Sequence, residues 1–180
     1  EYLLDKNPTL IEYSAFYGSI QILKYLLRNN VQISPYIWVY SIHSNNLDIL
    51  HFLQDNNVYI DYNMYEPLLS ESIKCHHNKI VDFLLTNYFD KEEFLTSNTI
   101  EQKFVDFSFQ YYNYAFFPEE LNGNSILFSL IKYAHNHLFT LIYTTKKINI
   151  RKAYNFAKNV ENHEIMKLLS QASSEIFEKT

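Results

Sequence analysis

The sequence predicts an all-α protein built from repeated helix pairs, on three observations. In residues 9–30, two amphipathic stretches of helical spacing are separated by Gly18-Ser19. The apolar pattern of the second stretch returns in residues 48–57, 79–87 and 164–172. With 2 Gly and 4 Pro in 180 residues, the chain lacks the special turns that all-β and α/β proteins need.

An apolar pair at the start of each second helix marks the repeat. The pairs are separated by 27, 31, 58 and 27 residues, and because 58 is twice 29, a divergent repeat is expected inside the long interval. Such a period is typical of a helical solenoid, in which each repeat covers the apolar stripe of its neighbour. The pairs are Ile22-Leu23, Ile49-Leu50, Ile80-Val81, Leu138-Phe139 and Ile165-Met166.

Turn residues keep the same register. Four residues before each apolar pair, the chain must reverse between the two helices of a repeat, and a left-handed backbone there suits Gly and Asn better than His, Ala or Glu. These positions are Gly18, Asn45, His76, Ala134 and Glu161. The residue after each of them is expected to cap the second helix, namely Ser19, Asn46, His77, His135 and Asn162.

The expected organisation is one solenoid domain over residues 1–180, with regular repeats over about 8–87 and 121–175 and a divergent repeat over about 88–120. In the divergent part, Phe104, Phe107, Tyr111 and Tyr114 follow at helical spacing. We interpret them as a helix buried between repeat blocks, because base stacking also needs cations and only Lys103 is near. The start at Glu1, without Met, is interpreted as a fragment of a longer protein.

Charge and cysteine content limit the partners and the compartment. A net charge of −5 and a pI near 5.8 count against nucleic acid. No apolar run reaches the roughly 18 residues that a membrane helix needs, so no membrane partner is expected. The single cysteine, Cys75, cannot form an internal disulfide, which favours a reducing compartment. We expect the cytoplasm, with the nucleus as an alternative.

The best-preserved repeat has a family resemblance. Thr9-Leu10-Ile11, Ser14-Ala15, Gly18 and residues 22–27 resemble an ankyrin repeat. Over most of its length, about residues 8–172, the chain is more similar to the domain of unknown function that precedes ankyrin repeats in the ankyrin-protein families of trichomonad protists. The resemblance implies an ankyrin-like solenoid of antiparallel helix pairs that acts as a non-catalytic protein-binding scaffold. The alternative is an intramolecular role, as an N-terminal spacer or cap for a longer array of ankyrin repeats in the same chain.

Candidate chemistry is sparse. Cys75-His76-His77 is the most ligand-like cluster, but adjacent residues on a helix point about 100° apart, which does not suit metal coordination. Glu92-Glu93 and Glu119-Glu120 are interpreted as solvated rather than as acid/base pairs. We therefore expect no catalytic residue, no cofactor and no metal, with Cys75 as a buried core residue. An enzyme using Cys75 and a histidine is the remote alternative.

The expected binding surface lies on the loops between repeats. Polar and aromatic residues occur there between apolar helices, and loops held on a rigid scaffold often carry binding function. The candidate protein-binding residues are Gln32, Ser34, Tyr36, Tyr59, Asp61 and Tyr62.

Overall fold

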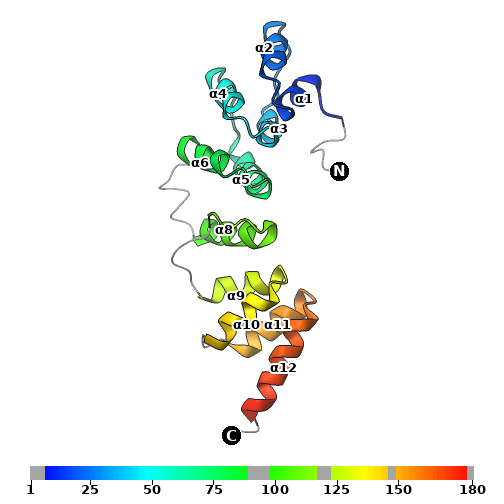
Figure 1. The fold of residues 1–180 in the computed structure, drawn as a ribbon, viewed down its shortest axis with the longest axis vertical. Helices are drawn as coiled ribbons and strands as arrows, with labels where there is room; N and C mark the ends of the chain where they lie inside the picture. The colour runs from blue at the N-terminus through cyan, green and yellow to red at the C-terminus, as the bar shows by residue number, and fades with distance from the viewer. Residues whose placement is uncertain (1–6, 89–97, 117–122, 146–148, 178–180) are drawn as a thin grey trace. The chain divides into compact units, whose positions relative to one another are not determined.

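The structure, a computed structural model, describes residues 7–88, 98–116, 123–145 and 149–177 (Figure 1). All elements in these ranges are α-helices, apart from the 3-10 helix η1 (Tyr62–Met64), and they contain no strand. The predicted all-α fold class is confirmed. The chain divides into two compact units, Glu1–Thr96 and Ser97–Thr180, which we describe separately.

The first unit contains three helix pairs. The first helices of successive pairs lie in a row, because α1 packs against α3 and α3 against α5, while each second helix packs against its own first helix (Figure 1). The pairs are α1 (Leu10–Phe16) with α2 (Ile20–Arg28), α3 (Ile37–His43) with α4 (Leu47–Asp55), and α5 (Tyr65–Lys74) with α6 (Asn78–Asn87).

The second unit repeats this arrangement after a helix without a described pair. That helix, α8, packs against α9, and α9 packs against α11, while α10 and α12 lie on α9 and α11 respectively. The bounds are α8 (Asn98–Tyr111), α9 (Gly123–Lys132), α10 (Asn136–Thr145), α11 (Ile150–Asn159) and α12 (His163–Phe177).

The turns within the pairs adopt the predicted backbone. All five predicted turn residues have positive φ: 72° at Gly18, 49° at Asn45, 57° at His76, 57° at Ala134 and 58° at Glu161. The left-handed conformation costs a non-glycine residue free energy, so Ala and Glu there show that the repeat geometry overrides local preference. This prediction is confirmed.

The hydrogen bonds at these turns recur at the end of α8. After α1, α5, α9 and α11, the backbone N–H one residue past the turn donates to the carbonyl five residues earlier, a common helix ending. The same bond follows α8, where Asn113 donates to Ser108 over 3.1 Å and Tyr112 has φ 57°. Thus α8 ends as the first helix of a pair does.

Two of the predicted helix caps form, and two do not. Asn46 caps α4 by accepting from the N–H of Asp48, and Asn162 accepts from the N–H of Ile165. Ser19 and His77 stand at the N-cap positions of α2 and α6 but make no side-chain cap bond. The ring of His77 donates instead to the Ile42 carbonyl at the end of α3, over 2.8 Å. For these two residues the side-chain capping prediction is wrong.

Small side chains let the first helices approach closely. Ser14, Ser41 and Ser72 occupy the same position of successive first helices, four residues before the turn, and all are buried. Each hydroxyl donates to a carbonyl of its own helix, at 2.7, 2.8 and 2.9 Å respectively, so burial leaves none of these donors unsatisfied.

Apolar residues of both helices in each pair form the core. Every apolar pair that marks the repeat has at least one fully buried member: Leu23, Ile49, Ile80, Phe139 and Ile165. In the divergent segment, Phe104 and Phe107 are buried on α8, which also contributes Val105 and Phe109 to the second core. Tyr114 lies beyond the end of α8 and is 45% exposed, so its predicted place in that helix is wrong.

Candidate functional site

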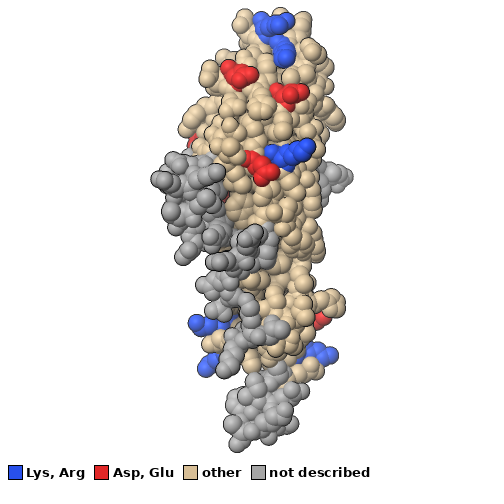
Figure 2. Space-filling view, turned by 60° about the vertical axis from the view of Figure 1, so that its left-hand side comes forward, with Lys and Arg blue, Asp and Glu red and all other residues tan. Residues whose placement is uncertain are grey.

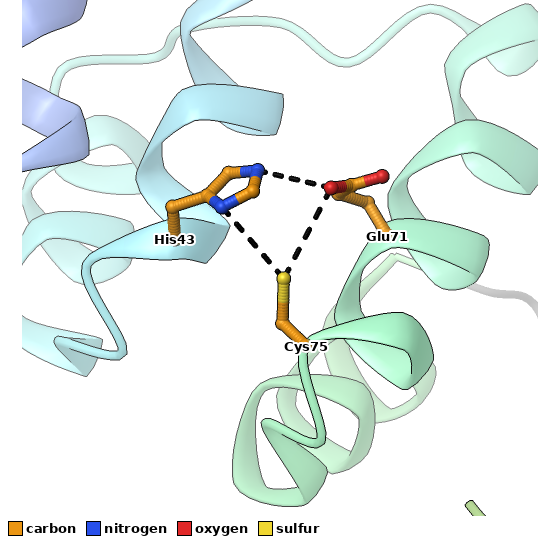
Figure 3. Close-up of side chains that lie close together, drawn as sticks. All are labelled: His43, Glu71 and Cys75. Atoms are coloured by element: carbon orange, nitrogen blue, oxygen red, sulfur yellow. Dashed lines mark hydrogen bonds and ion pairs between the residues drawn. The ribbon is translucent and has the colours of Figure 1, made fainter. Parts of the chain in front are cut away.

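A cluster of three reactive side chains joins the second helix pair to the third. His43 is the last residue of α3, and Glu71 and Cys75 lie one helical turn apart at the end of α5. Residues spaced by four share one face of a helix, and that face of α5 meets α3. The imidazole ring therefore faces both the carboxylate and the thiol, and the three groups form a triangle (Figure 3).

Each ring nitrogen of His43 faces a different partner. Nδ1 lies 3.7 Å from Cys75 Sγ, and Nε2 lies 3.0 Å from Glu71 Oε1. The second contact is an ion pair, since Nε2 has no hydrogen-bond partner within the described residues. Cys75 Sγ is 4.0 Å from the same carboxylate oxygen, which closes the triangle in Figure 3.

The surroundings of the cluster favour a charged imidazole. The hydrogen bond with Cys75, and then the contact with Glu71, raise the pKa of His43 from 6.5 to about 9 against the opposing effect of burial. The same histidine is the main cause that lowers the pKa of the Glu71 carboxyl. At neutral pH the site therefore holds an imidazolium paired with a carboxylate. The position of His43 at a helix C-terminus also favours the cation.

Neighbouring groups hold the cluster in place. The ring of Phe16, at the end of α1, stacks on His43 with the ring centroids 4.8 Å apart. Lys74 Nζ lies 3.1 Å from Glu71 Oε1 and 3.2 Å from Oε2, so it contacts both carboxylate oxygens. The side chains of His43 and Glu71 are only 16% and 11% exposed, so this is a partly buried network.

Cys75, His76 and His77, the most ligand-like stretch of the sequence, have separate surroundings in the structure. His76 occupies the left-handed turn, and the ring of His77 bonds to the Ile42 carbonyl. Cys75 is partly exposed, so the prediction of a buried core cysteine is wrong. The repeat register could have indicated its actual partners. His43 lies two residues before the turn residue Asn45 of one pair, and Cys75 lies one residue before the turn residue of the next.

The chemistry of the cluster depends on which group each ring nitrogen of His43 contacts. The arrangement is that of a thiol, a base beside it and a carboxylate that orients the base. Histidine, cysteine and glutamate are also common metal ligands, but here the thiol and the carboxylate occupy both ring nitrogens, and Lys74 lies on the carboxylate. The geometry fits a hydrogen-bonded, charge-paired thiol better than a coordination site.

Five of the six predicted loop residues lie at the surface, and the sixth is in a 3-10 helix. Gln32, Ser34, Tyr36, Tyr59 and Asp61 are all exposed, and Tyr62 begins η1. A separate polar groove lies at the turns within pairs, lined by residues 45–48 and 76–79, and Cys75 is not among its lining residues. The carboxylate pairs at 92–93 and 119–120 lie outside the described residues.

Comparison with family models, with curated proteins and with solved structures gives no match to this chain. No helix within the described residues is both long enough and apolar enough to span a membrane. Arguments about function therefore start from the helix pairs, the exposed loops and the cluster around Cys75.

Proposed function

We propose that this chain is a non-catalytic scaffold of ankyrin-like solenoid type, which binds another protein through the loops between its helix pairs. The support comes from two loops of the first unit, residues 29–36 between α2 and α3 and residues 56–61 between α4 and η1. Both connect one repeated pair to the next, so they occupy equivalent positions in the array.

The two loops begin with the same backbone conformation. Asn30 and Asn57 have positive φ, 60° and 53°, and the next residues, Val31 and Val58, donate to Leu26 and Leu53 over 3.2 and 3.0 Å. Side chains then alternate. Ile60 is buried, whereas its neighbours are exposed, as are most residues of the earlier loop. The alternation directs Ile60 into the core and leaves Tyr59 and Asp61 exposed, where they are available to a partner.

One observation carries the proposal. An exposed tyrosine directly follows a residue whose carbonyl is fixed by a hydrogen bond from a buried tryptophan. Trp38 is fully buried in α3, and its indole N–H donates to the Val58 carbonyl over 3.0 Å. The adjacent Tyr59 is 72% exposed. A large aromatic group on a fixed loop loses little conformational freedom on binding, which is the property of residues that dominate interface energies. Tyr36, 39% exposed on the preceding loop, is the second such group.

The charge distribution favours protein over nucleic acid as the partner. The net charge is −5, and on the face shown in Figure 2 the described Lys and Arg side chains are interspersed with acidic and uncharged ones. A surface that follows a phosphate backbone needs clustered cations. Tyrosine, serine and glutamine on the loops instead suit the polar and aromatic contacts of protein interfaces.

The proposal is tested by comparing partners of the wild-type protein with those of Tyr36→Ala/Tyr59→Ala. Proteins captured from cells by each variant are quantified by mass spectrometry, and each candidate is then produced and its affinity measured by calorimetry. We expect at least one direct partner whose affinity falls about tenfold or more in the double variant, because exposed aromatic anchors contribute roughly 1–3 kcal/mol each.

Tyr25→Ala is the matched control. Tyr25 is 66% exposed on α2 and lies in neither loop, so the same chemical change there should leave affinity unchanged. Circular dichroism and thermal melts check that each variant is folded. If every direct partner bound the loop variant and the wild type equally well, the loops would not be the binding surface.

A second candidate is an intramolecular role as a spacer or cap for further repeats. The observation that favours it is the apolar surface of α1, where Leu10 is 65% and Tyr17 is 69% exposed. In a stack of helix pairs, such a surface is where another pair would pack. A version of the chain with natural flanking sequence should then bury these two side chains, which hydrogen exchange and protease protection would reveal.

A further inference from the structure

The Cys75 cluster places a thiol beside a histidine, an arrangement that protein binding does not require. Its thiol is partly exposed and lies in hydrogen-bond contact with a histidine that a carboxylate and an aromatic ring hold in place. Three successive helix pairs supply these groups: Phe16 from the first, His43 from the second, and Glu71 with Cys75 from the third. The cluster is therefore a product of the stacking and does not exist in any one pair.

The charge on His43 bears directly on the sulfur. A thiolate, not a thiol, is the nucleophile in cysteine chemistry, and a neighbouring imidazolium stabilises it. The proton held on Nδ1 points at Sγ across 3.7 Å, and Glu71 stabilises the positive ring from its other nitrogen. Lys74 adds a second cation beside Glu71 and limits how far that carboxylate opposes the negative sulfur.

We propose that Cys75 is an oxidative modification site, at which a thiolate paired with His43 reacts with hydrogen peroxide. The sulfur lone pair attacks one peroxide oxygen, an S–O bond forms and the O–O bond breaks. The departing hydroxide takes the proton from His43 and leaves as water. Sulfur is oxidised by two electrons to the sulfenic acid, and the peroxide oxygens are reduced by the same two electrons.

Cys75 is partly exposed, so hydrogen peroxide can reach its sulfur. The chain has one cysteine, so the sulfenic acid cannot resolve into an internal disulfide. The sulfenic acid must instead react with a small thiol or be reduced by an external reductant.

The first test measures how fast the thiol reacts in the whole chain at neutral pH. Iodoacetamide alkylation is followed by intact mass for the folded wild type and for the same protein unfolded in urea, where His43 no longer faces the sulfur. We expect the folded protein to react at least about fivefold faster, since only there does the His43 ring lie beside the sulfur and stabilise the negative charge in the attacking state. Equal rates, or slower reaction in the folded state, would overturn the proposal without any variant.

The second test identifies the activating residue and the oxidant. Protein treated with hydrogen peroxide in the presence of dimedone should gain the dimedone adduct on Cys75, and His43→Asn should lose both this adduct and the fast alkylation. His76→Asn is the matched control, because His76 is adjacent to Cys75 but lies in a left-handed turn that Asn accepts readily. A folded His43→Asn variant that reacts like the wild type would refute the role of His43. Fast alkylation without an adduct would refute peroxide as the oxidant.

Discussion

The Nδ1 atom of His77 lies 2.8 Å from the carbonyl oxygen of Ile42, in the preceding helix pair. The second unit repeats this relationship, with His135 Nε2 2.8 Å from the Phe109 carbonyl and Asn162 Nδ2 2.9 Å from the Ile131 carbonyl. Carbonyls at a helix C-terminus have no partner within the helix. At these three turns the residue after the turn therefore satisfies the end of the previous first helix, and it fixes how one helix pair sits on the next.

Removing one of these bonds should destabilise the second unit. His135→Ala leaves the Phe109 carbonyl without its side-chain donor, and we expect a loss of about 1–3 kcal/mol in the free energy of unfolding. Urea denaturation followed by circular dichroism measures it. His137→Ala, at an exposed position of α10, should change stability by less than about 0.5 kcal/mol. Equal effects of the two changes would show that the bond between pairs contributes nothing.

The contacts of His43 with Cys75 and with Glu71 should make stability depend on pH on both the acidic and the alkaline side. The folded pKa of His43, about 9, lies above its ordinary 6.5, so its stabilising contribution is complete below about pH 6.5 and is lost as pH rises through 9. The folded pKa of Glu71 is lowered, so its contribution is present above its ordinary 4.5 and is lost as pH falls through the folded value. Together they give greatest stability between about pH 4.5 and 6.5.

The variant that tests this pH profile is His43→Gln. Glutamine cannot carry the imidazolium charge, so the decline in melting temperature between about pH 6.5 and 9 should be shallower than in the wild type. His137→Gln is the control, because this exposed histidine makes no ion pair in the described structure. The proposed charge pairing would be wrong if the wild type and His43→Gln lost stability in parallel over that range.

Periodicity predicts the fold of this chain better than its site. The turn residues from Gly18 to Glu161 could be placed because apolar pairs recur at nearly constant intervals. The end of α8 was not predicted because the apolar pair four residues after Tyr112, Phe116-Phe117, follows Ile80-Val81 by 36 residues and so falls outside the nearly constant interval. The Cys75 cluster was not predicted for another reason, since His43 is 32 residues from Cys75 in sequence and meets it only where α3 packs on α5. Adjacent residues in the sequence suggested His76 and His77, but the turn directs their side chains elsewhere.

Truncating a core leucine tests the repeat register. Leu84 is 1% exposed on α6, and Leu84→Ala should reduce the free energy of unfolding by about 2–5 kcal/mol through the cavity it leaves. Leu26→Ala, at the equivalent stripe of α2, should lie in the same range or slightly below it, because Leu26 is 9% exposed. Leu141→Ala, at a 65% exposed position, should cost less than about 0.5 kcal/mol. Thermal melts that were unchanged by both buried truncations would contradict the register.

Exchanging glycine and alanine between two turns should change stability in opposite directions. Gly18 and Ala134 occupy the same repeat position with φ 72° and 57°, a region where a Cβ atom is unfavourable. Gly18→Ala should therefore destabilise by about 1 kcal/mol. Space is not the cause, because the new Cβ would lie 3.6 Å from Ser44 Cβ, an ordinary contact. Ala134→Gly should stabilise by about 0.5–1 kcal/mol, since relief of strain outweighs the added freedom of the unfolded chain.

The control for this exchange is Gln171→Gly in α12, where the backbone is helical and glycine should destabilise by about 0.5–1 kcal/mol. Urea unfolding of the three variants then separates backbone strain from a general effect of glycine. If Ala134→Gly destabilised as Gln171→Gly does, the left-handed turn would not be a source of strain. In that case local relaxation of the backbone would remove the conformational cost of alanine at this turn. Stacking of the helix pairs would then not be holding Ala134 in a strained conformation.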